Sequence, residues 1–317
     1  MGLADELAGL NAQLGTKLGE DAIEADLESL GLTELPAVVL KLGQLTTLVL
    51  DGNRLVELPE SLSDLSGLTE LHCRNNRLRQ LPGGLCACHR LEGLFFEGNQ
   101  LSELPERLGV LGTLRGLEVS RNELCRLPES LTQCVELEGL YCDHNRLEVL
   151  PPSLGHMIAL EELSLRHNGL TALPASIGML ERLRELRLSH NRWGRYPCDL
   201  LRLAALPVEI GLLTAVKGLF LDHNRLSSLP AEIGNMASLE DCNLENNKLK
   251  SLPGTVVDLA NLKGLYLENN QLDTLGFVPA KMAGLRRMSI AGNGLSNAET
   301  ASLEAAGIEL KRPTMKE

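Results

Sequence analysis

The sequence predicts an α/β solenoid, a horseshoe with a parallel concave sheet of about 12 strands and short helical turns on its convex side. Three observations predict this fold class: a leucine-spaced segment that recurs every 23 residues, a proline-led apolar segment that follows it, and 44% hydrophobic residues with only 3% aromatics. A solenoid grows by stacking, so the 317 residues need not divide into two domains.

The recurring segment has the template L-x-x-L-x-L-x-x-N-x-L, seen in full over residues 45–55. A leading copy over 25–36 carries Leu30 in place of the asparagine. Eleven copies in register are typical of leucine-rich repeats. The asparagines stand 23 residues apart, with one interval of 33, at Asn53, Asn76, Asn99, Asn122, Asn145, Asn168, Asn191, Asn224, Asn247, Asn270 and Asn293.

Each position of the repeat has a physical reason. In the strand expected over 48–50, alternation buries the two leucines and turns the middle residue outward. The asparagines are expected to point inward and bond turn backbone, a structural role. A proline such as Pro59 suits the start of a helical turn. Glycines are expected to turn the chain back toward the next strand, at Gly109, Gly155, Gly178, Gly211 and Gly234.

Three regions follow along the chain, because the ends of a repeat array need caps. Residues 1–20 are predicted to form an N-terminal capping helix, residues 21–296 the array, and residues 297–317 a C-terminal cap and tail. The last region is predicted to contain a helix over 297–305 and an edge segment over 308–310. One face of the first helix is apolar, with Leu3, Leu7, Leu10, Leu14 and Leu18.

The interval of 33 residues marks an irregular unit over 192–215. A proline and three leucines there match the spacing of Pro59, Leu62, Leu65 and Leu68; they are Pro197, Leu200, Leu203 and Leu206. A second convex segment starts at once with Pro207. We interpret this as a repeat that lost its strand and kept its convex half. It is either a neutral deletion or a contact loop carrying Trp193, Arg195 and Tyr196.

The outward residues of the strands are predicted to form a column on the concave face. It holds four of the eight aromatics of the chain: Phe95, Tyr141, Phe220 and Tyr266. Each follows Gly-Leu, and a glycine two residues back leaves room for the ring to lie flat. Phe95 and Tyr141 stand two strands apart, as do Phe220 and Tyr266. The two rings of each pair are therefore expected to lie roughly 10 Å apart, too far to stack. They either pack along the column or bind a partner, with His72, Glu118 and Arg187 beside them.

The charge balance narrows the class of partner. The chain has 30 Lys and Arg against 42 Asp and Glu, a net charge of −12, which disfavours nucleic acid and anionic membranes. Three outward columns hold eleven acids, Asp51, Glu70, Glu97, Glu118, Asp143, Glu162, Glu185, Asp222, Asp241, Glu245 and Glu268. Only Arg74, Arg166, Arg187 and Arg287 oppose them, a net of −7. This predicts a protein partner with apolar anchors in a basic surround.

Catalytic chemistry is not expected. A histidine precedes the repeat asparagine four times, at His144, His167, His190 and His223. Metal sites need convergent ligands and a repeat predicts a straight row, so these histidines are expected to be solvated or bonded to turns, with no metal bound. No phosphate-binding loop, dinucleotide motif or catalytic triad is found, which predicts no enzyme activity, no cofactor and no small-molecule substrate.

The cysteines point to a reducing compartment. Five of the eight replace apolar repeat residues: Cys73, Cys88, Cys134, Cys142 and Cys242. They are expected to be buried thiols rather than a disulfide framework. No flanking cysteine clusters, glycosylation sequon, signal peptide or long apolar run is seen. We therefore expect a cytoplasmic protein without membrane insertion.

The longer form L-x-x-L-x-L-x-x-N-x-L-x-x-L-P-x-x-[IL]-G-x-L, clearest over 170–191 and 229–247, resembles the intracellular Ras-group leucine-rich-repeat proteins over roughly 25–296. This resemblance implies a non-catalytic interaction scaffold or regulator, in small-GTPase or kinase signalling, that binds through its concave face. An alternative is a recognition or inhibitory subunit of an enzyme complex such as a phosphatase or ubiquitin ligase. A secreted immune-type receptor or effector is a third class, disfavoured by the missing signal and cysteine caps.

Overall fold

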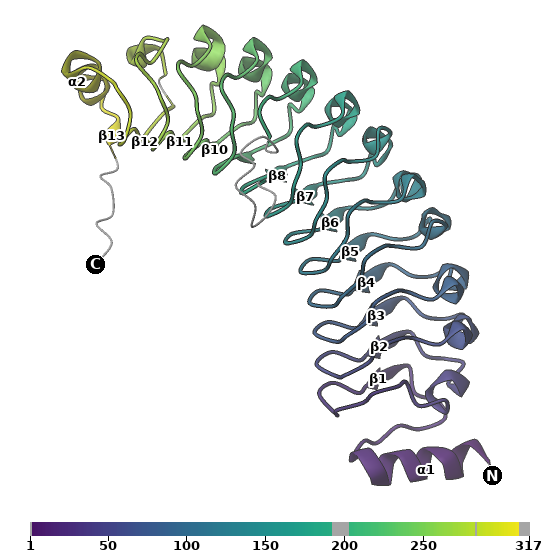
Figure 1. The fold of residues 1–317 in the computed structure, drawn as a ribbon. Coiled ribbons are helices and arrows are strands. Elements are labelled where there is room, and N and C mark those ends of the chain that lie inside the picture. The colour runs from purple at the N-terminus through teal and green to yellow at the C-terminus, as the bar shows by residue number, and fades with distance from the viewer. Residues whose placement is uncertain (1, 192–202, 283, 311–317) are drawn as a thin grey trace. The chain divides into compact units, whose positions relative to one another are not determined.

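The structure, a computed structural model, describes residues 2–191, 203–282 and 284–310. It consists of two compact units, Met1–Asn145 and Arg146–Glu317. In each unit, short strands line one side and 3-10 helices line the other (Figure 1). We call the surface formed by the outward residues of the strands the sheet face of that unit. The leucine-rich-repeat solenoid predicted from the sequence is confirmed.

The first unit opens with helix α1, Leu3–Leu14. Its strands are β1 Glu24–Asp26, β2 Thr47–Val49, β3 Glu70–His72, β4 Gly93–Phe95, β5 Gly116–Glu118 and β6 Gly139–Tyr141. Its 3-10 helices are Val39–Lys41, Glu60–Asp64, Gly83–Ala87, Leu108–Val110 and Glu129–Gln133.

The second unit contains strands β7 Glu162–Ser164, β8 Glu185–Arg187, β9 Gly218–Phe220, β10 Asp241–Asn243, β11 Gly264–Tyr266, β12 Arg287–Ser289 and β13 Glu309–Leu310. Its 3-10 helices are Leu154–His156, Ala175–Met179, Val208–Leu212, Ala231–Asn235, Gly254–Asp258 and Pro279–Lys281. Helix α2, Asn297–Ala305, precedes β13 and is capped by the side chain of Ser296.

All the pairs recorded within each unit are parallel and in register, so that Leu48 of β2 lies opposite Leu71 of β3. Thirteen strands are described rather than about 12, because β13 pairs with β12. Strand β2 covers Thr47–Val49 instead of the expected 48–50. The ladder still continues past its end, since the Leu50 N–H donates to the His72 carbonyl over 2.7 Å.

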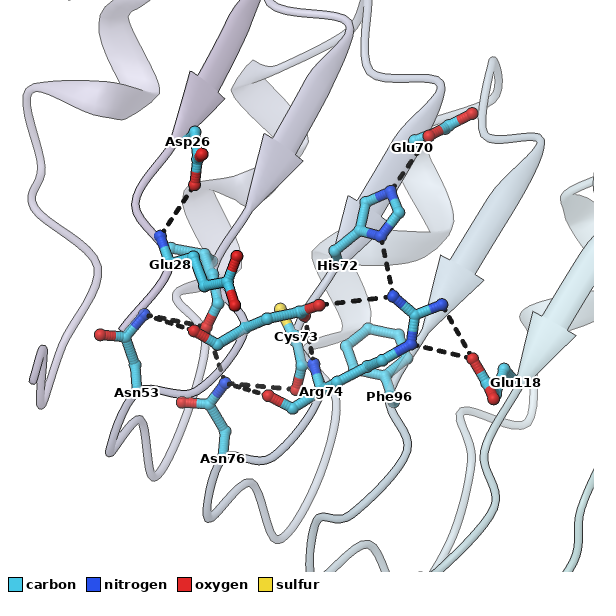
Figure 2. A network of polar contacts seen from close by, with 12 residues as sticks. Asp26, Glu28, Asn53, Glu70, His72, Cys73, Arg74, Asn76, Phe96 and Glu118 are labelled. Carbon is cyan, nitrogen blue, oxygen red and sulfur yellow. Dashed lines mark hydrogen bonds and ion pairs between the residues drawn. The ribbon is translucent and has the colours of Figure 1, made fainter. Parts of the chain in front are cut away.

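The repeat asparagines connect each turn to the preceding repeat. In Asn76, Nδ2 donates to the carbonyl oxygens of Leu50 (2.8 Å) and Cys73 (3.2 Å), and Oδ1 accepts from the Leu55 N–H (3.0 Å). Figure 2 shows Asn76 and its neighbour Asn53. Ten of the eleven are buried, at 8% exposure or less. A single amide thus satisfies three backbone groups that have no strand partner.

The residue before each repeat asparagine occupies a left-handed turn position. In the described repeats without glycine there, φ lies between 54° and 58°, at Ser29, Asn75, Arg121, His144, His167, His190, His223, Asn246 and Asn269. Asparagine and histidine tolerate this region better than most residues. The row of histidines therefore has a backbone cause that the sequence pattern did not show.

The glycines of the turn side have a different role from the one expected. Their φ values are not positive, so they do not reverse the chain. A Cβ on Gly178 would lie 2.6 Å from the carbonyl oxygen of Glu209 in the next turn. Clashes closer still would arise at Gly109, Gly155, Gly211 and Gly234. The expected turn reversal is wrong, and these glycines instead let neighbouring 3-10 helices approach closely.

The leucines of the irregular unit occupy other repeat positions than expected. The Arg225 N–H donates to the Leu203 carbonyl (3.0 Å), as the Arg77 N–H donates to the Leu55 carbonyl (2.9 Å) in a regular repeat. Leu203 thus takes the position of Leu55 rather than that of Leu65.

Leu206 then precedes Pro207 and the next 3-10 helix, as Leu58 precedes Pro59. Strands β8 and β9 pair directly. The expected alignment of Leu203 and Leu206 with Leu65 and Leu68 is therefore wrong, and Asn191 and Asn224 stand ten residues farther apart than the asparagines of regular repeats. Outside the described residues lie Trp193, Arg195, Tyr196, Pro197 and Leu200.

Helix α1 buries Leu7 and Leu10 and ends at Gly15, whose φ of 73° breaks the helix. Leu18 therefore does not lie on it. No helix within the described ranges is long and apolar enough to cross a membrane.

The cysteines at apolar repeat positions are buried free thiols, as expected. Burial, reinforced by the charge of Asp241, raises the pKa of the Cys242 thiol to about 12, which keeps it protonated. Burial also raises the pKa of Cys88 and Cys134 to about 11. Cys125, by contrast, is exposed. The buried thiols therefore act as small apolar core residues.

Candidate binding surface

Each aromatic of the column folds back over the glycine two residues before it. Cε2 of Tyr141 lies 2.9 Å from the point where a Cβ on Gly139 would stand, and Phe220 has the same relation to Gly218. The same arrangement holds for Phe95 over Gly93 and for Tyr266 over Gly264. All four rings are half-buried. The glycine therefore forms a floor, and part of the ring stays open to solvent.

Strand β5 provides the internal comparison. Gly116 occupies the same strand position but precedes Glu118, and a Cβ there would meet nothing within 4 Å. The missing side chain leaves open space in this strand, whereas in the four others an aromatic ring fills it.

Phe95 is covered by its own neighbours, which the spacing argument did not foresee. The His72 ring of the adjacent strand stacks on it, with centroids 4.4 Å apart and planes inclined by 21°. The Arg74 guanidinium carbon lies 4.5 Å from the Phe95 centroid. A histidine and an arginine of the adjacent strand thus already contact Phe95.

Arg74 is the centre of a polar network on the sheet face of the first unit (Figure 2). Its Nε donates to Glu118 (2.9 Å), and its Nη1 lies 3.3 Å from Asp51 and 3.2 Å from Nδ1 of His72. Nε2 of His72 lies 3.0 Å from Glu70. Burial lowers the pKa of Arg74, but the hydrogen bonds and charges of Glu118 and Asp51 outweigh it and raise the pKa. His72 and Glu118, both candidate contacts, are therefore already engaged.

In the second unit, the face around Phe220 is hollowed. A groove of about 540 Å³ is lined by Gly218, Phe220, Glu161, Glu162, Arg184, Glu185, Lys217, Glu240 and Asp241. Arg187 contacts Glu185 over 2.6 Å and Glu162 over 3.6 Å. The Arg166 guanidinium lies 5.8 Å from the Phe220 centroid, farther away than Arg74 is from Phe95. Phe220 is thus less closely contacted by its cation than Phe95 is.

Two of the outward strand residues of the second unit are buried. Ser164 and Ser289 are 2% and 0% exposed. The Ser289 hydroxyl donates to Glu245 over 3.1 Å. The column expected from the sequence is therefore interrupted at these strands.

The acidity is concentrated in the first unit. Its three outward columns hold eight carboxylates and a single cation, Arg74; the carboxylates are Glu24, Asp26, Glu28, Asp51, Glu70, Glu97, Glu118 and Asp143. The residues from β1 belong to the leading copy, which lacks the asparagine and was not counted from the sequence. In the described part of the second unit, Glu162, Glu185, Asp222, Asp241, Glu245, Glu268 and Glu309 face Arg166, Arg187 and Arg287.

Comparisons with known families agree with this architecture. A family model described as "Leucine-rich repeat region" matches residues 84–206. A second, described as "Leucine rich repeat", matches residues 43–101 and 214–272. A search of curated proteins found no match.

Solved structures with the same fold come from several sources. A leucine-rich-repeat protein of Leptospira interrogans is 28% identical, with a TM-score of 0.61, over 89% of this chain and 82% of that one. An internalin of Listeria monocytogenes is 17% identical, with a TM-score of 0.69, over 98% and 95%. A chain of an octameric complex of Latrophilin 3, Unc5D and FLRT2, the last named as its LRR part, is 24% identical, with a TM-score of 0.64, over 81% and 78%. From its repeats, its fold and these matches, the chain belongs to the leucine-rich-repeat proteins.

Proposed function

We propose that this protein is a non-catalytic interaction scaffold or regulator that binds a protein partner on its sheet face. Leucine-rich repeats generally mediate protein–protein interaction, and the array over 21–296 is the binding module, capped by 1–20 and 297–317. The observation that carries the proposal is the set of four rings held on glycine floors. Rigid, partly exposed aromatics supply contact area at low entropic cost, as binding hot spots do.

The chemistry of the partner follows from what surrounds the rings. Eight carboxylates against one arginine favour a basic surround opposite the first unit, which steers association and fixes orientation. The half-buried ring of Phe220, which lines the groove, favours an apolar anchor opposite the second unit. The partner we propose therefore presents apolar side chains among lysines and arginines.

The compartment we propose is the reducing cytoplasm. Support comes from the seven described cysteines, which are all free thiols. The resemblance to Ras-group proteins favours small-GTPase or kinase signalling as the pathway. A recognition or inhibitory subunit of an enzyme complex would use the same surface, and it differs in requiring one stoichiometric partner.

Affinity purification with mass spectrometry tests the surface. We expect the change of Phe95, Tyr141, Phe220 and Tyr266 to Ala to abolish partner recovery, because each hot-spot truncation typically costs about 2 kcal/mol or more. The melting temperature should stay near that of the wild type, since these rings are half-buried.

The matched control truncates four exposed apolar residues of the turn side to Ala: Ile158, Met179, Val208 and Leu212. This variant should recover the same partners as the wild type. If the sheet-face variant keeps its partners while the turn-side variant loses them, the proposed surface is the wrong one.

A further inference from the structure

Two histidines and an aspartate converge at one corner of the second unit. His190 and His223 both precede a repeat asparagine, and both hold left-handed φ values of 57° and 58°. Their rings stack with centroids 3.9 Å apart, and His167 continues the stack at 4.3 Å from His190. Because the backbone turn is the same in each repeat, successive side chains leave it in the same direction.

Asp222 closes the group from the neighbouring column. Its Oδ2 lies 2.9 Å from Nδ1 of His223 and 3.8 Å from Nε2 of His190. One ligand atom from each of the three residues lies within 4.8 Å of the others. Imidazole nitrogens with a carboxylate oxygen form a donor set that suits Zn²⁺, Cu²⁺ and Ni²⁺.

Ser189 orients the carboxylate. Its hydroxyl donates to Oδ1 of Asp222 over 2.5 Å, and the Asp222 side chain is only 13% exposed. Oδ1 is thus held by a serine, and Oδ2 is directed at both imidazoles. Hydrogen bonds of this kind fix ligating carboxylates in metal sites.

The combination occurs at one place among the described repeats. His144 has Arg121 at the same position of the preceding repeat, and His167 is preceded by Arg166 rather than by an acid. Asp143 also stands beside His144, but it belongs to the earlier repeat of the His144 and His167 pair. Among the described residues, the ligand atoms come within reach of one another at His190, Asp222 and His223.

We propose that His190, Asp222 and His223 form a binding site for one late first-row divalent cation. Parallel rings 3.9 Å apart do not direct their in-plane lone pairs at one point, so binding turns the two imidazoles out of the stack. Both side chains have room to turn, at 38% and 44% exposure. The cation then replaces the contacts of Asp222 with the two rings, and Ser189 keeps its bond.

Zn²⁺ titration of the untagged full chain, read by competition with a chromophoric chelator, tests the site. The wild type should bind one equivalent. His190→Asn and His223→Asn should each weaken binding at least tenfold, as should Asp222→Asn. Asparagine suits the turn, since Asn75, Asn246 and Asn269 hold φ of 54° to 56° at this position. Ser189→Ala, which removes only the orienting bond, should cost about 10- to 100-fold.

His144→Asn is the matched control, because it makes the same change at the same turn position outside the group, and it should leave Zn²⁺ affinity unchanged. With Co²⁺ in place of Zn²⁺, the visible absorption band should appear in the wild type and disappear in His223→Asn. Absence of stoichiometric binding, or equal affinity in His144→Asn and His223→Asn, would overturn the proposal. Circular dichroism of every variant verifies that a loss of binding is not a loss of fold.

Discussion

At the scale of single residues, the sheet face depends on its glycines as much as on its aromatic side chains. Gly139 and Gly218 are required not by their backbone angles but by the rings that lie over them. A methyl group at either would stand 2.9 Å from an aromatic carbon, well inside contact distance. The ring would have to leave its place.

Gly139→Ala should therefore displace the Tyr141 ring, whereas Gly116→Ala should not disturb its strand. Alanine in a strand gains roughly 0.5–1 kcal/mol over glycine, and overpacking costs about 1–3 kcal/mol. We expect Gly116→Ala to be neutral or stabilising and Gly139→Ala to be less stable than it by about 1–3 kcal/mol. Urea unfolding measures both. Equal stability with unchanged partner recovery would mean that the glycine floor is not needed.

The asparagine ladder makes a second prediction at this scale. Nδ2 of Asn145 donates to the carbonyls of Val119 (2.9 Å) and Cys142 (3.1 Å), and its Oδ1 accepts from the Leu124 N–H (3.0 Å). Asn145→Leu leaves these groups buried without that partner, at roughly 1–3 kcal/mol each. We expect a lowered unfolding curve that divides into two steps, with partner binding retained at low temperature.

The neighbouring change His144→Asn serves as the control, since asparagine occupies that turn position in other repeats. Its unfolding curve should overlay that of the wild type. A single, unshifted transition for Asn145→Leu would show that the asparagine has another reason for its place in the repeat.

Spacing along the sequence identified the rings, their glycines and the asparagines, because strand alternation relates residues two apart. It did not identify Arg74 over Phe95, which reaches across from the adjacent strand. It treated the histidines as a straight row, because it considered one column at a time and Asp222 belongs to the next. Contacts between columns depend on side-chain directions that a repeat pattern does not contain.

At the scale of elements, the 3-10 helices of the turn side pack backbone against backbone. The glycine in L-P-x-x-[IL]-G looks like a chain reversal in one repeat, and its role appears only when the next repeat is beside it. The irregular unit was misaligned for a related reason. Leucines three residues apart occur both before and after the repeat proline, so Leu203 and Leu206 fit two registers by spacing alone. The hydrogen bond from Arg225 to Leu203 decides between them.

Gly211→Ala tests the packing of these helices. A Cβ at Gly211 would meet the backbone of Glu232 and stand 2.7 Å from its Cβ, so the neighbouring helices must separate. We expect a loss of about 1–3 kcal/mol, measured by urea unfolding. Gly254→Ala is the control in the same unit, because its Cβ would stand 3.9 Å from the carbonyl oxygen of Gly276 and Ala231 begins the preceding 3-10 helix. If both changes cost the same, close approach is not the reason for the glycine.

At the scale of the whole molecule, stability is a sum of repeat terms and nearest-neighbour terms. The terminal repeats have a neighbour on one side only, so the caps must cover the other. Helix α1 packs Leu7 and Leu10 inward, and Glu6 pairs with Lys41 over 2.6 Å. A defect in this cap should lower the stability of the repeats beside it. The loss of stability should become smaller with each further repeat along the array.

Leu7→Ala tests this argument by hydrogen exchange with mass spectrometry. Leu7 is 2% exposed, and truncating such a leucine costs about 2–5 kcal/mol. Peptides covering β1 and β2 should lose protection, whereas those covering β9 to β12 should exchange as in the wild type. Gln13→Ala, on the exposed side of the same helix, should change neither set. A uniform loss across both units would instead mean that the chain unfolds as a single cooperative block, because only global unfolding exposes distant repeats equally.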